Sequence, residues 1–199
     1  MSVAAVILAA GSGSRFNRGE DEAVPGDKLL SIVQGRALLS WALAPALEAG
    51  LDEVVVVSGA ADLRAVIPGS VTVLTNEDWS KGQASSLRVG LEWCSSRGHA
   101  SAVIGLGDMP GLTAQAWRAV ADAPRGPIVF ATYRGQRAHP VRLDAEIWSM
   151  LSPEGDEGAR ALVRRRPKLA QEVACVGVPS DIDTPQDLQR WSGEHGTDQ

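Results

Sequence analysis

Strand-like apolar runs alternate with helix-like segments along most of this 199-residue chain. Continuous apolar strands that are separated by helices are typical of an α/β fold, in which helices cover both faces of a mostly parallel sheet. The predicted strands are residues 3–9, 53–57, 71–75, 100–106, 128–132 and 172–178. The predicted helices are residues 36–49, 62–66, 84–94, 114–122, 145–151 and 158–165.

The length of the chain and the signals at its helix ends agree with one domain. We expect a single domain over residues 1–191, followed by a polar tail at residues 192–199. Thr113 is predicted to cap the helix that follows it. Thr184 and Pro185 predict a further helix start, with a capping hydroxyl and then proline at the first helical position.

Composition excludes several classes of function. The net charge of -5 argues against binding to nucleic acid or to a membrane surface, which would require a basic face. No apolar run approaches the roughly 18 residues of a membrane span, and no secretory leader is evident, so we expect a cytoplasmic protein. Cys94 and Cys175 are far apart in the sequence and are expected to be reduced, and three scattered histidines do not predict a zinc site.

The first predicted strand ends in a small, glycine-rich loop, Gly11-Ser12-Gly13-Ser14-Arg15. Glycines let backbone N–H groups approach an anion closely, and Arg15 and the later Lys28 add positive charge, so the loop is a candidate phosphate cradle. Its spacing fits neither the P-loop nor the dinucleotide fingerprint, since Phe16 stands where the fingerprint has its third small residue. A plain tight turn is the alternative.

Isolated carboxylates follow two other apolar runs. Asp108 comes directly after one predicted strand, and Asp181 and Asp183 follow the last. Ligands of parallel sheets bind at the carboxyl ends of the strands, and Mg²⁺ accepts one or two carboxylates together with water and phosphate oxygens. Asp183, which is nearer the start of the next helix, is the preferred second ligand beside Asp108. The alternatives are a turn aspartate at 108 and a helix-capping role for Asp183.

Three further loops are candidate ligand sites, each with a plain structural alternative. Gly82, Ser85 and Ser86 open a helix whose hydroxyl and N–H groups suit a phosphate or a base edge, although Ser also caps helices. His139 follows a basic turn that suits a second anionic substrate or is simply solvated. Arg160 follows a glycine-flanked loop, and its guanidinium suits a phosphate or is only a surface side chain of its helix.

Together these motifs resemble the molybdenum-cofactor nucleotidyltransferases. The resemblance covers residues 3–190, and the blocks occur in the order of that family. They are Leu8-Ala9-Ala10-Gly11-Ser12-Gly13-Ser14-Arg15 with Lys28, Asn76 to Arg88, Gly107-Asp108-Met109-Pro110, His139-Pro140-Val141, Gly155 to Arg160, and Asp181 to Leu188. The chain looks most like the cytidylyltransferases, because Ala10 stands where guanylyl-transferring relatives usually carry glycine.

The resemblance implies a Rossmann-like three-layer α/β sandwich that joins CMP from CTP to molybdopterin, with Mg²⁺ and with release of pyrophosphate. Arg15, Lys28 and Asp108 would be catalytic, and Asp108 and Asp183 would hold Mg²⁺. His139 and Arg160 would face the pterin side, and a molybdoenzyme or its maturation factor would be a further partner. The remaining binding residues implied are Leu8, Ala9, Ala10, Gly11, Ser12, Gly13, Asn76, Gly82, Ser85 and Ser86.

Two departures and two rival functions accompany the resemblance. An acidic insert, Glu20-Asp21-Glu22, lengthens the approach to Lys28 and leaves its reach to the phosphates open, and Ala138 stands where the family usually has glycine. The same scaffold is also used by nicotine blue oxidoreductases, which are thought to use a nicotinamide cofactor, so an NAD(P)H-dependent reaction is one alternative. A non-catalytic carrier of the molybdenum cofactor is the other.

Overall fold

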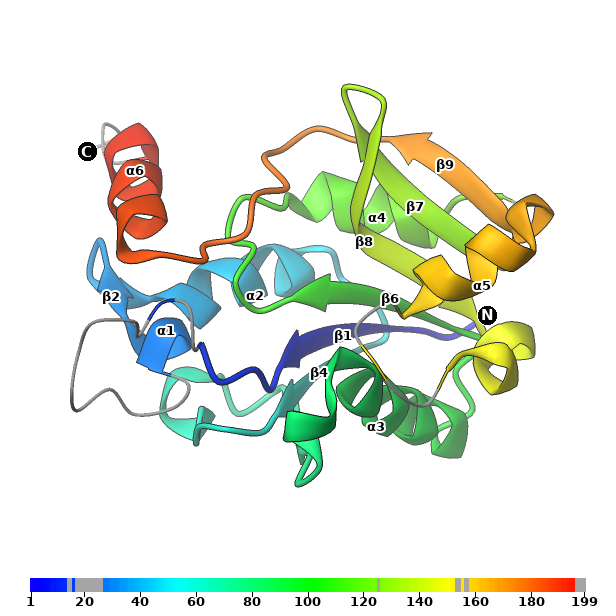
Figure 1. Cartoon of the computed structure of the whole chain (residues 1–199), viewed down its shortest axis with the longest axis horizontal. Helices are drawn as coiled ribbons and strands as arrows, with labels where there is room; N and C mark the ends of the chain where they lie inside the picture. The colour runs from blue at the N-terminus through cyan, green and yellow to red at the C-terminus, as the bar shows by residue number, and fades with distance from the viewer. Residues whose placement is uncertain (14–15, 17–26, 125, 153–154, 156–157, 196–199) are drawn as a thin grey trace.

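A seven-stranded sheet forms the centre of the molecule (Figure 1). The computed structural model describes residues 1–13, 16, 27–124, 126–152, 155 and 158–195. The strand order is β5-β4-β1-β6-β8-β7-β9, and every pairing is parallel except those of β8, which runs antiparallel to both neighbours. The strands are β1 (Val3–Ala9), β4 (Glu53–Ser58), β5 (Thr72–Thr75), β6 (Ser101–Leu106), β7 (Ile128–Tyr133), β8 (Gln136–Asp144) and β9 (Ala170–Ala174). A small hairpin of β2 (Ile32–Val33) and β3 (Arg36–Ala37) lies outside the sheet.

Helices cover both faces of the sheet, so the predicted three-layer sandwich is confirmed. The α-helices are α1 (Asp27–Leu30), α2 (Leu38–Glu48), α3 (Gln83–Ser96), α4 (Ala114–Ala121), α5 (Ala159–Arg165) and α6 (Pro185–His195). The 3₁₀ turns are η1 (Arg64–Val66), η2 (Trp79–Lys81), η3 (Ala145–Met150) and η4 (Pro167–Leu169). One apolar core lies under α2, α4 and α6, and a second lies under α3 and α5.

Strand β1 supplies both cores. Ala5 and Ile7 belong to the core under α2, whereas Ala4, Val6 and Leu8 belong to the core under α3. Successive side chains of a strand point to opposite faces, so a strand that is buried on both sides must be apolar throughout. This is the reason why the apolar runs of the sequence predicted a covered parallel sheet.

The antiparallel strand β8 was not predicted. We interpreted residues 134–137 as a basic turn, and the structure limits that turn to Arg134 and Gly135, whose φ angles of 52° and 80° form a two-residue hairpin loop. The sequence pattern did not indicate this strand, because it contains several polar residues and Pro140, and proline rarely occurs inside a sheet. A register shift opposite Phe130 and Ala131 accommodates the proline.

Three other predicted elements differ from the structure. Only the 3₁₀ turn η1 forms within residues 62–66, and residues 145–151 contain the 3₁₀ turn η3 instead of an α-helix. The last strand begins before residue 172 and ends at Ala174, because the chain beyond it crosses to the loop after β6.

Both predicted helix caps are confirmed. Thr113 Oγ1 accepts the N–H of Ala116 at 3.1 Å. Thr184 Oγ1 accepts the N–H of Asp187 at 3.2 Å, and the Asp187 carboxylate accepts the N–H of Thr184 at 2.9 Å. Helix α6 continues from this reciprocal cap to His195, four residues into the stretch that we assigned to the tail.

Candidate functional site

Two cavities open at the carboxyl ends of β1 and β6. The first has a volume of about 490 Å³ and the second about 680 Å³, and they share Leu8, Gln83 and Leu106 as lining residues. The chain passes from β1 to β4 and β5 on one side, then returns to place β6 on the other side of β1. Such a reversal of strand order leaves a crevice at the strand ends, which is where ligands bind in open α/β sheets.

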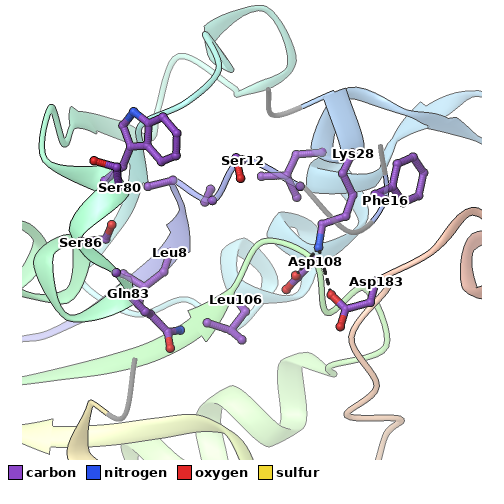
Figure 2. A pocket seen from close by; sticks show the side chains of 17 residues that line it. Leu8, Ser12, Phe16, Lys28, Ser80, Gln83, Ser86, Leu106, Asp108 and Asp183 are labelled. Atoms are coloured by element: carbon purple, nitrogen blue, oxygen red, sulfur yellow. Dashed lines mark hydrogen bonds and ion pairs between the residues drawn. The ribbon is translucent and has the colours of Figure 1, made fainter. Parts of the chain in front are cut away.

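The glycine-rich loop forms one wall of the first cavity. All six residues from Leu8 to Gly13 line it, together with Phe16 (Figure 2). Gly13 has a φ angle of 66°, and a β-carbon at this position would stand 3.1 Å from the β-carbon of Lys28. Glycine therefore permits both the left-handed backbone and the close approach of α1. Arg15, which we predicted to be catalytic, lies outside the described residues.

Lys28 reaches the first cavity in spite of the long connection before it. Its Nζ lies 2.7 Å from Asp108 Oδ2 and 3.6 Å from Asp183 Oδ1, as the dashed lines in Figure 2 show. The lysine is 8% exposed, so the ammonium is held at the cavity wall between two carboxylates. The structure therefore brings together three residues that the sequence separates by as many as 155 positions (183 − 28).

A strap of chain after β9 carries Asp183 to its position opposite Asp108. Residues 175–183 run along the loop after β6, where Val178 N–H donates to Gly111 O and Ile182 N–H donates to Asp108 O, each at 2.9 Å. A β-carbon on Gly111 would stand 2.4 Å from Val178 O, so only glycine allows the strap to lie this close. The reciprocal cap of α6 is built from Thr184 and Asp187, so Asp183 is not the capping residue of that helix.

Asp181 lines the second cavity. Burial raises the pKa of its carboxyl group, and the negative charges of Asp108 and Asp183 raise it further. In the described part of the chain, no group of three or more His, Cys, Asp and Glu side chains is arranged to hold a metal. A metal held by Asp108 and Asp183 would therefore take its other ligands from water and phosphate oxygens, as Mg²⁺ commonly does.

The start of α3 forms the opposite wall of the first cavity. Gly82 and Ser86 line it, and so do Gln83 and Trp79 of η2, neither of which was among our predicted site residues. Their only signal in the sequence was their place inside the block that runs from Asn76 to Arg88.

Asn76 and Ser85, in contrast, brace the wall from behind. Both are buried and neither is among the described lining residues of the two cavities. Asn76 Nδ2 donates to Ser85 Oγ at 2.8 Å and to Ser86 Oγ at 2.9 Å, and Ser85 Oγ donates to Gly82 O at 2.8 Å. These bonds hold the loop between β5 and α3 in a fixed shape.

The second cavity joins an apolar chamber to a basic rim. Its walls include Leu87, Ile104, Phe130, Val141, Leu143 and Val163. Arg137, Arg160 and Arg164 also line it, and the Arg137 guanidinium lies 5.2 Å from the Phe130 ring centroid while its Nε is 2.6 Å from Glu172. The chamber suits a flat, largely apolar ring system that carries an anionic group.

His139 lies inside this chamber. Burial lowers the pKa of its imidazole, so the ring is neutral near neutral pH. Its Nδ1 is 3.1 Å from the carbonyl oxygen of Ile104, an arrangement in which Nδ1–H donates and Nε2 is left as an acceptor. His139 reaches this edge because β8 is antiparallel, which places its first half beside the carboxyl end of β6.

Comparisons with known proteins give the chain a family and relatives. The profile of the MobA-like NTP transferase domain matches residues 5–172. Nicotine blue oxidoreductase from Paenarthrobacter nicotinovorans is 30% identical over 204 residues, which cover 94% of this chain and 95% of that protein.

Solved structures show the same fold. A crystal structure of Rv0371c from Mycobacterium tuberculosis H37Rv in complex with manganese is 27% identical, with a TM-score of 0.78 over 97% of this chain and 99% of that one. A nucleotidyl transferase from Methanothermobacter has a TM-score of 0.82 over 97% of both chains and is 23% identical.

Proposed function

Because the chain belongs to the MobA-like NTP transferase family, we propose that it transfers the CMP group of CTP to the terminal phosphate of molybdopterin and releases pyrophosphate. The observation that carries this proposal is the pair of connected cavities, one with a cation between two carboxylates and one with a basic rim around an apolar chamber. A transferase that joins two substrates needs two adjoining sites whose ligands meet at one point.

The first cavity is the proposed nucleotide site. The backbone from Leu8 to Gly13 and the side chain of Ser12 would hold the triphosphate, with Arg15 and Lys28 neutralising its charge. Gly82 and Ser86 of the opposite wall would contact the nucleotide, and Asn76 and Ser85 would keep that wall in shape. Ala10 is the residue on which the preference for CTP over GTP rests.

Asp108 and Asp183 are the proposed ligands of a divalent cation, for which we propose Mg²⁺. Two carboxylates that converge on one cation supply the hard oxygen donors that this ion prefers. The manganese complex of the Mycobacterium tuberculosis relative supports a divalent cation in this family. When bound, the ion would neutralise the triphosphate and stabilise the departing pyrophosphate.

The second cavity is the proposed acceptor site. The neutral His139 ring would accept a hydrogen bond from an N–H group of the pterin, and Arg160 would bind the terminal phosphate. An oxygen of that phosphate would attack the α-phosphorus of CTP. A new P–O bond would form, and the bond to the bridging oxygen would break, so that its electron pair leaves with pyrophosphate.

No general base is required in this reaction. A phosphate monoester is already anionic near neutral pH, so its oxygen is a nucleophile without prior loss of a proton. The chain would act through positioning and charge neutralisation, which are the dominant contributions in phosphoryl-type transfer.

The alternative is an NAD(P)H-dependent oxidoreductase, which is favoured by the 30% identity to nicotine blue oxidoreductase. The Lys28, Asp108 and Asp183 cluster argues for the transferase, because hydride transfer does not use a metal–phosphate site. A molybdoenzyme or its maturation factor is the proposed recipient of the product, and a cytoplasmic location is proposed with it. No described helix is long and apolar enough to cross a membrane.

The test is a direct comparison of substrates. Purified protein is incubated with molybdopterin, Mg²⁺ and either CTP or GTP while pyrophosphate release is measured, and separately with NADPH and nicotine blue while NADPH oxidation is measured. We expect pyrophosphate release with CTP and a smaller rate with GTP. Equal turnover with GTP would refute the base preference, and NADPH oxidation without pyrophosphate release would establish the alternative.

A further inference from the structure

The buried ammonium of Lys28 stands where the two candidate metal ligands converge. Its Nζ is 2.7 Å from Asp108 Oδ2 and 3.6 Å from Asp183 Oδ1. The carboxylate side chains are only 23% and 38% exposed, so neither is freely surrounded by water. Without a cation between them, the two carboxylates would repel each other, because water screens their charges only in part at this site.

A divalent cation held by both carboxylates would lie between them, in the space where Lys28 Nζ now stands. Ligand oxygens must approach Mg²⁺ to about 2.1 Å, so the ammonium could not stay in that space beside the ion. A positive charge that remained a few ångströms away would also repel the ion. The ammonium and the metal are therefore competitors for one position, whatever the acceptor substrate is.

We propose that Lys28 is an internal cation that holds Asp108 and Asp183 together in the ligand-free protein, and that a divalent ion binds there by displacing it. Lys28 is then a positioning residue with two successive partners. It is bound to the carboxylates before the substrate arrives, and it is released toward the glycine-rich loop when the metal and the triphosphate enter. The loop is close at hand, because Gly13 packs directly against the β-carbon of Lys28.

The proposal rests on the metal part of the proposed function and on none of its substrates. It predicts that the nucleotide-free protein binds divalent ions weakly because Lys28 opposes them. It also predicts that the lysine side chain becomes more accessible when such an ion binds.

The first experiment is a titration of nucleotide-free protein with Mn²⁺, in which free Mn²⁺ is measured by electron paramagnetic resonance. Lys28→Met keeps most of the aliphatic stem and removes the charge, whereas Lys28→Arg keeps the charge. We expect Lys28→Met to bind Mn²⁺ at least about tenfold more tightly than the wild type, and Lys28→Arg to stay within about threefold. The gain should vanish in Lys28→Met combined with Asp108→Asn. Equal or weaker Mn²⁺ binding by folded Lys28→Met would overturn the proposal.

The second experiment uses the wild-type protein and does not depend on the folding of a variant. Lysine amines are labelled with an acylating reagent, and the extent is read at each site by mass spectrometry. Lys81, whose side chain is 62% exposed, is the internal reference. We expect Mn²⁺ or Mg²⁺ to increase labelling of Lys28 severalfold relative to Lys81.

Unchanged or reduced labelling of Lys28 at saturating metal would contradict displacement. Neither experiment contains CTP, molybdopterin or NADPH, so a wrong substrate would leave both results intact. Failure of the proposed function would be seen instead in the pyrophosphate assay.

Discussion

Two buried cations, Lys28 and Arg142, differ in the partners that surround them. Lys28 faces two carboxylates at the rim of a cavity. Arg142, on β8, is 7% exposed and donates to four backbone carbonyl groups that end or follow α4, at Val120, Ala121, Ala123 and Gly126. Its Nε is also 3.0 Å from Asp144 Oδ1.

The difference separates a structural cation from an exchangeable one. Ala121 ends α4 and Ala123 and Gly126 follow it, so the guanidinium satisfies carbonyl groups at and just beyond the helix C-terminus. The carboxylates around Lys28 are ligands that a metal can also use, and they open onto a space that can admit one. We infer that a buried cation serves function where a ligand can replace it at its partners, as at Lys28. It serves the stability of the fold where no ligand can do so, as at Arg142.

The largest effect is expected at the exchangeable site. Asp108→Ala removes a proposed metal ligand, so transfer should fall by about a thousandfold or more, which is at least about 4 kcal/mol of transition-state stabilisation. The fold should persist, because the backbone oxygen of residue 108 still accepts the N–H of Ile182. Pyrophosphate release measures the loss and circular dichroism measures the fold. Asp78→Ala removes an exposed carboxylate that pairs with Lys81, and it should change activity less than twofold as the control. Retained turnover in Asp108→Ala would mean that Asp108 is not a metal ligand, and Lys28 would then not differ from Arg142 in having exchangeable partners.

The structural cation should behave in the opposite way. Arg142→Met leaves buried carbonyl groups without a donor, so the free energy of unfolding in urea should fall by about 3 kcal/mol, while the folded fraction should bind Mn²⁺ as the wild type does.

Asp144→Asn is the matched control for Arg142. Burial raises the pKa of Asp144 even though Arg142 opposes the shift, so the charged carboxylate gains little from folding. The control should therefore change stability by less than about 1 kcal/mol. If Asp144→Asn lowered the free energy of unfolding more than Arg142→Met does, the ion pair would be the main stabilising interaction of Arg142, and the contacts with the helix end would be secondary.

A substitution in the contact between Gly111 and the strap that positions Asp183 should have an intermediate effect on stability and on Mn²⁺ binding. Gly111→Ala places a β-carbon 2.4 Å from Val178 O, so the strap must shift. We expect a loss of about 1–3 kcal/mol in stability together with weaker Mn²⁺ binding. Gly69→Ala is the control, since a β-carbon there meets no atom within 4 Å. Normal Mn²⁺ affinity in Gly111→Ala would mean that Asp183 is not held by the strap.

At the rim of the second cavity the expected effect is smaller. Arg160→Ala should raise the apparent KM for molybdopterin about tenfold and leave CTP affinity, measured by calorimetry, nearly unchanged. Arg165→Ala, an exposed neighbour at the end of α5, should change neither. Loss of CTP binding in Arg160→Ala would move this arginine to the nucleotide site.

The smallest effect concerns Glu53, a partly buried carboxylate at the other end of the sheet whose partners are His99, Trp93 and Thr72. Burial raises the pKa of Glu53, but the hydrogen bonds from His99, Trp93 and Thr72 outweigh it and lower the pKa below its usual value. A lowered folded-state pKa stabilises the protein above the unfolded pKa, and this contribution is lost as the pH falls through the folded value.

Glu53→Gln tests this dependence. The wild type should exceed the variant in unfolding free energy by about 1 kcal/mol at pH 7, and the gap should close below about pH 4. Urea unfolding at several pH values measures it. A gap that widens toward acidic pH would reverse the sign of our assignment.

Much of the lining of the first cavity could be predicted because its residues follow parallel strands. Gly11 follows β1 and Asp108 follows β6, and the carboxyl ends of parallel strands meet at one edge of the sheet. His139 is different, because it lies within an antiparallel strand that the sequence pattern did not indicate. Asn76 and Ser85 differ in another way, since both are buried and brace the loop before α3 instead of lining a cavity. Spacing along a chain does not report which way a polar side chain points.

The three layers follow from the amino-acid sequence alone, because a strand that is buried on both faces has to be apolar along its whole length. The capped helix starts at Thr113 and Thr184 follow from it as well, because they depend on neighbouring residues alone. Tertiary contacts, in contrast, bring Lys28 Nζ between Asp108 and Asp183 and place Arg142 at the end of α4. The physical reason is that the partner of a charged side chain depends on its burial and on its distance from segments that are remote in the chain. Neither the burial nor the distance can be derived from the neighbouring residues in the sequence.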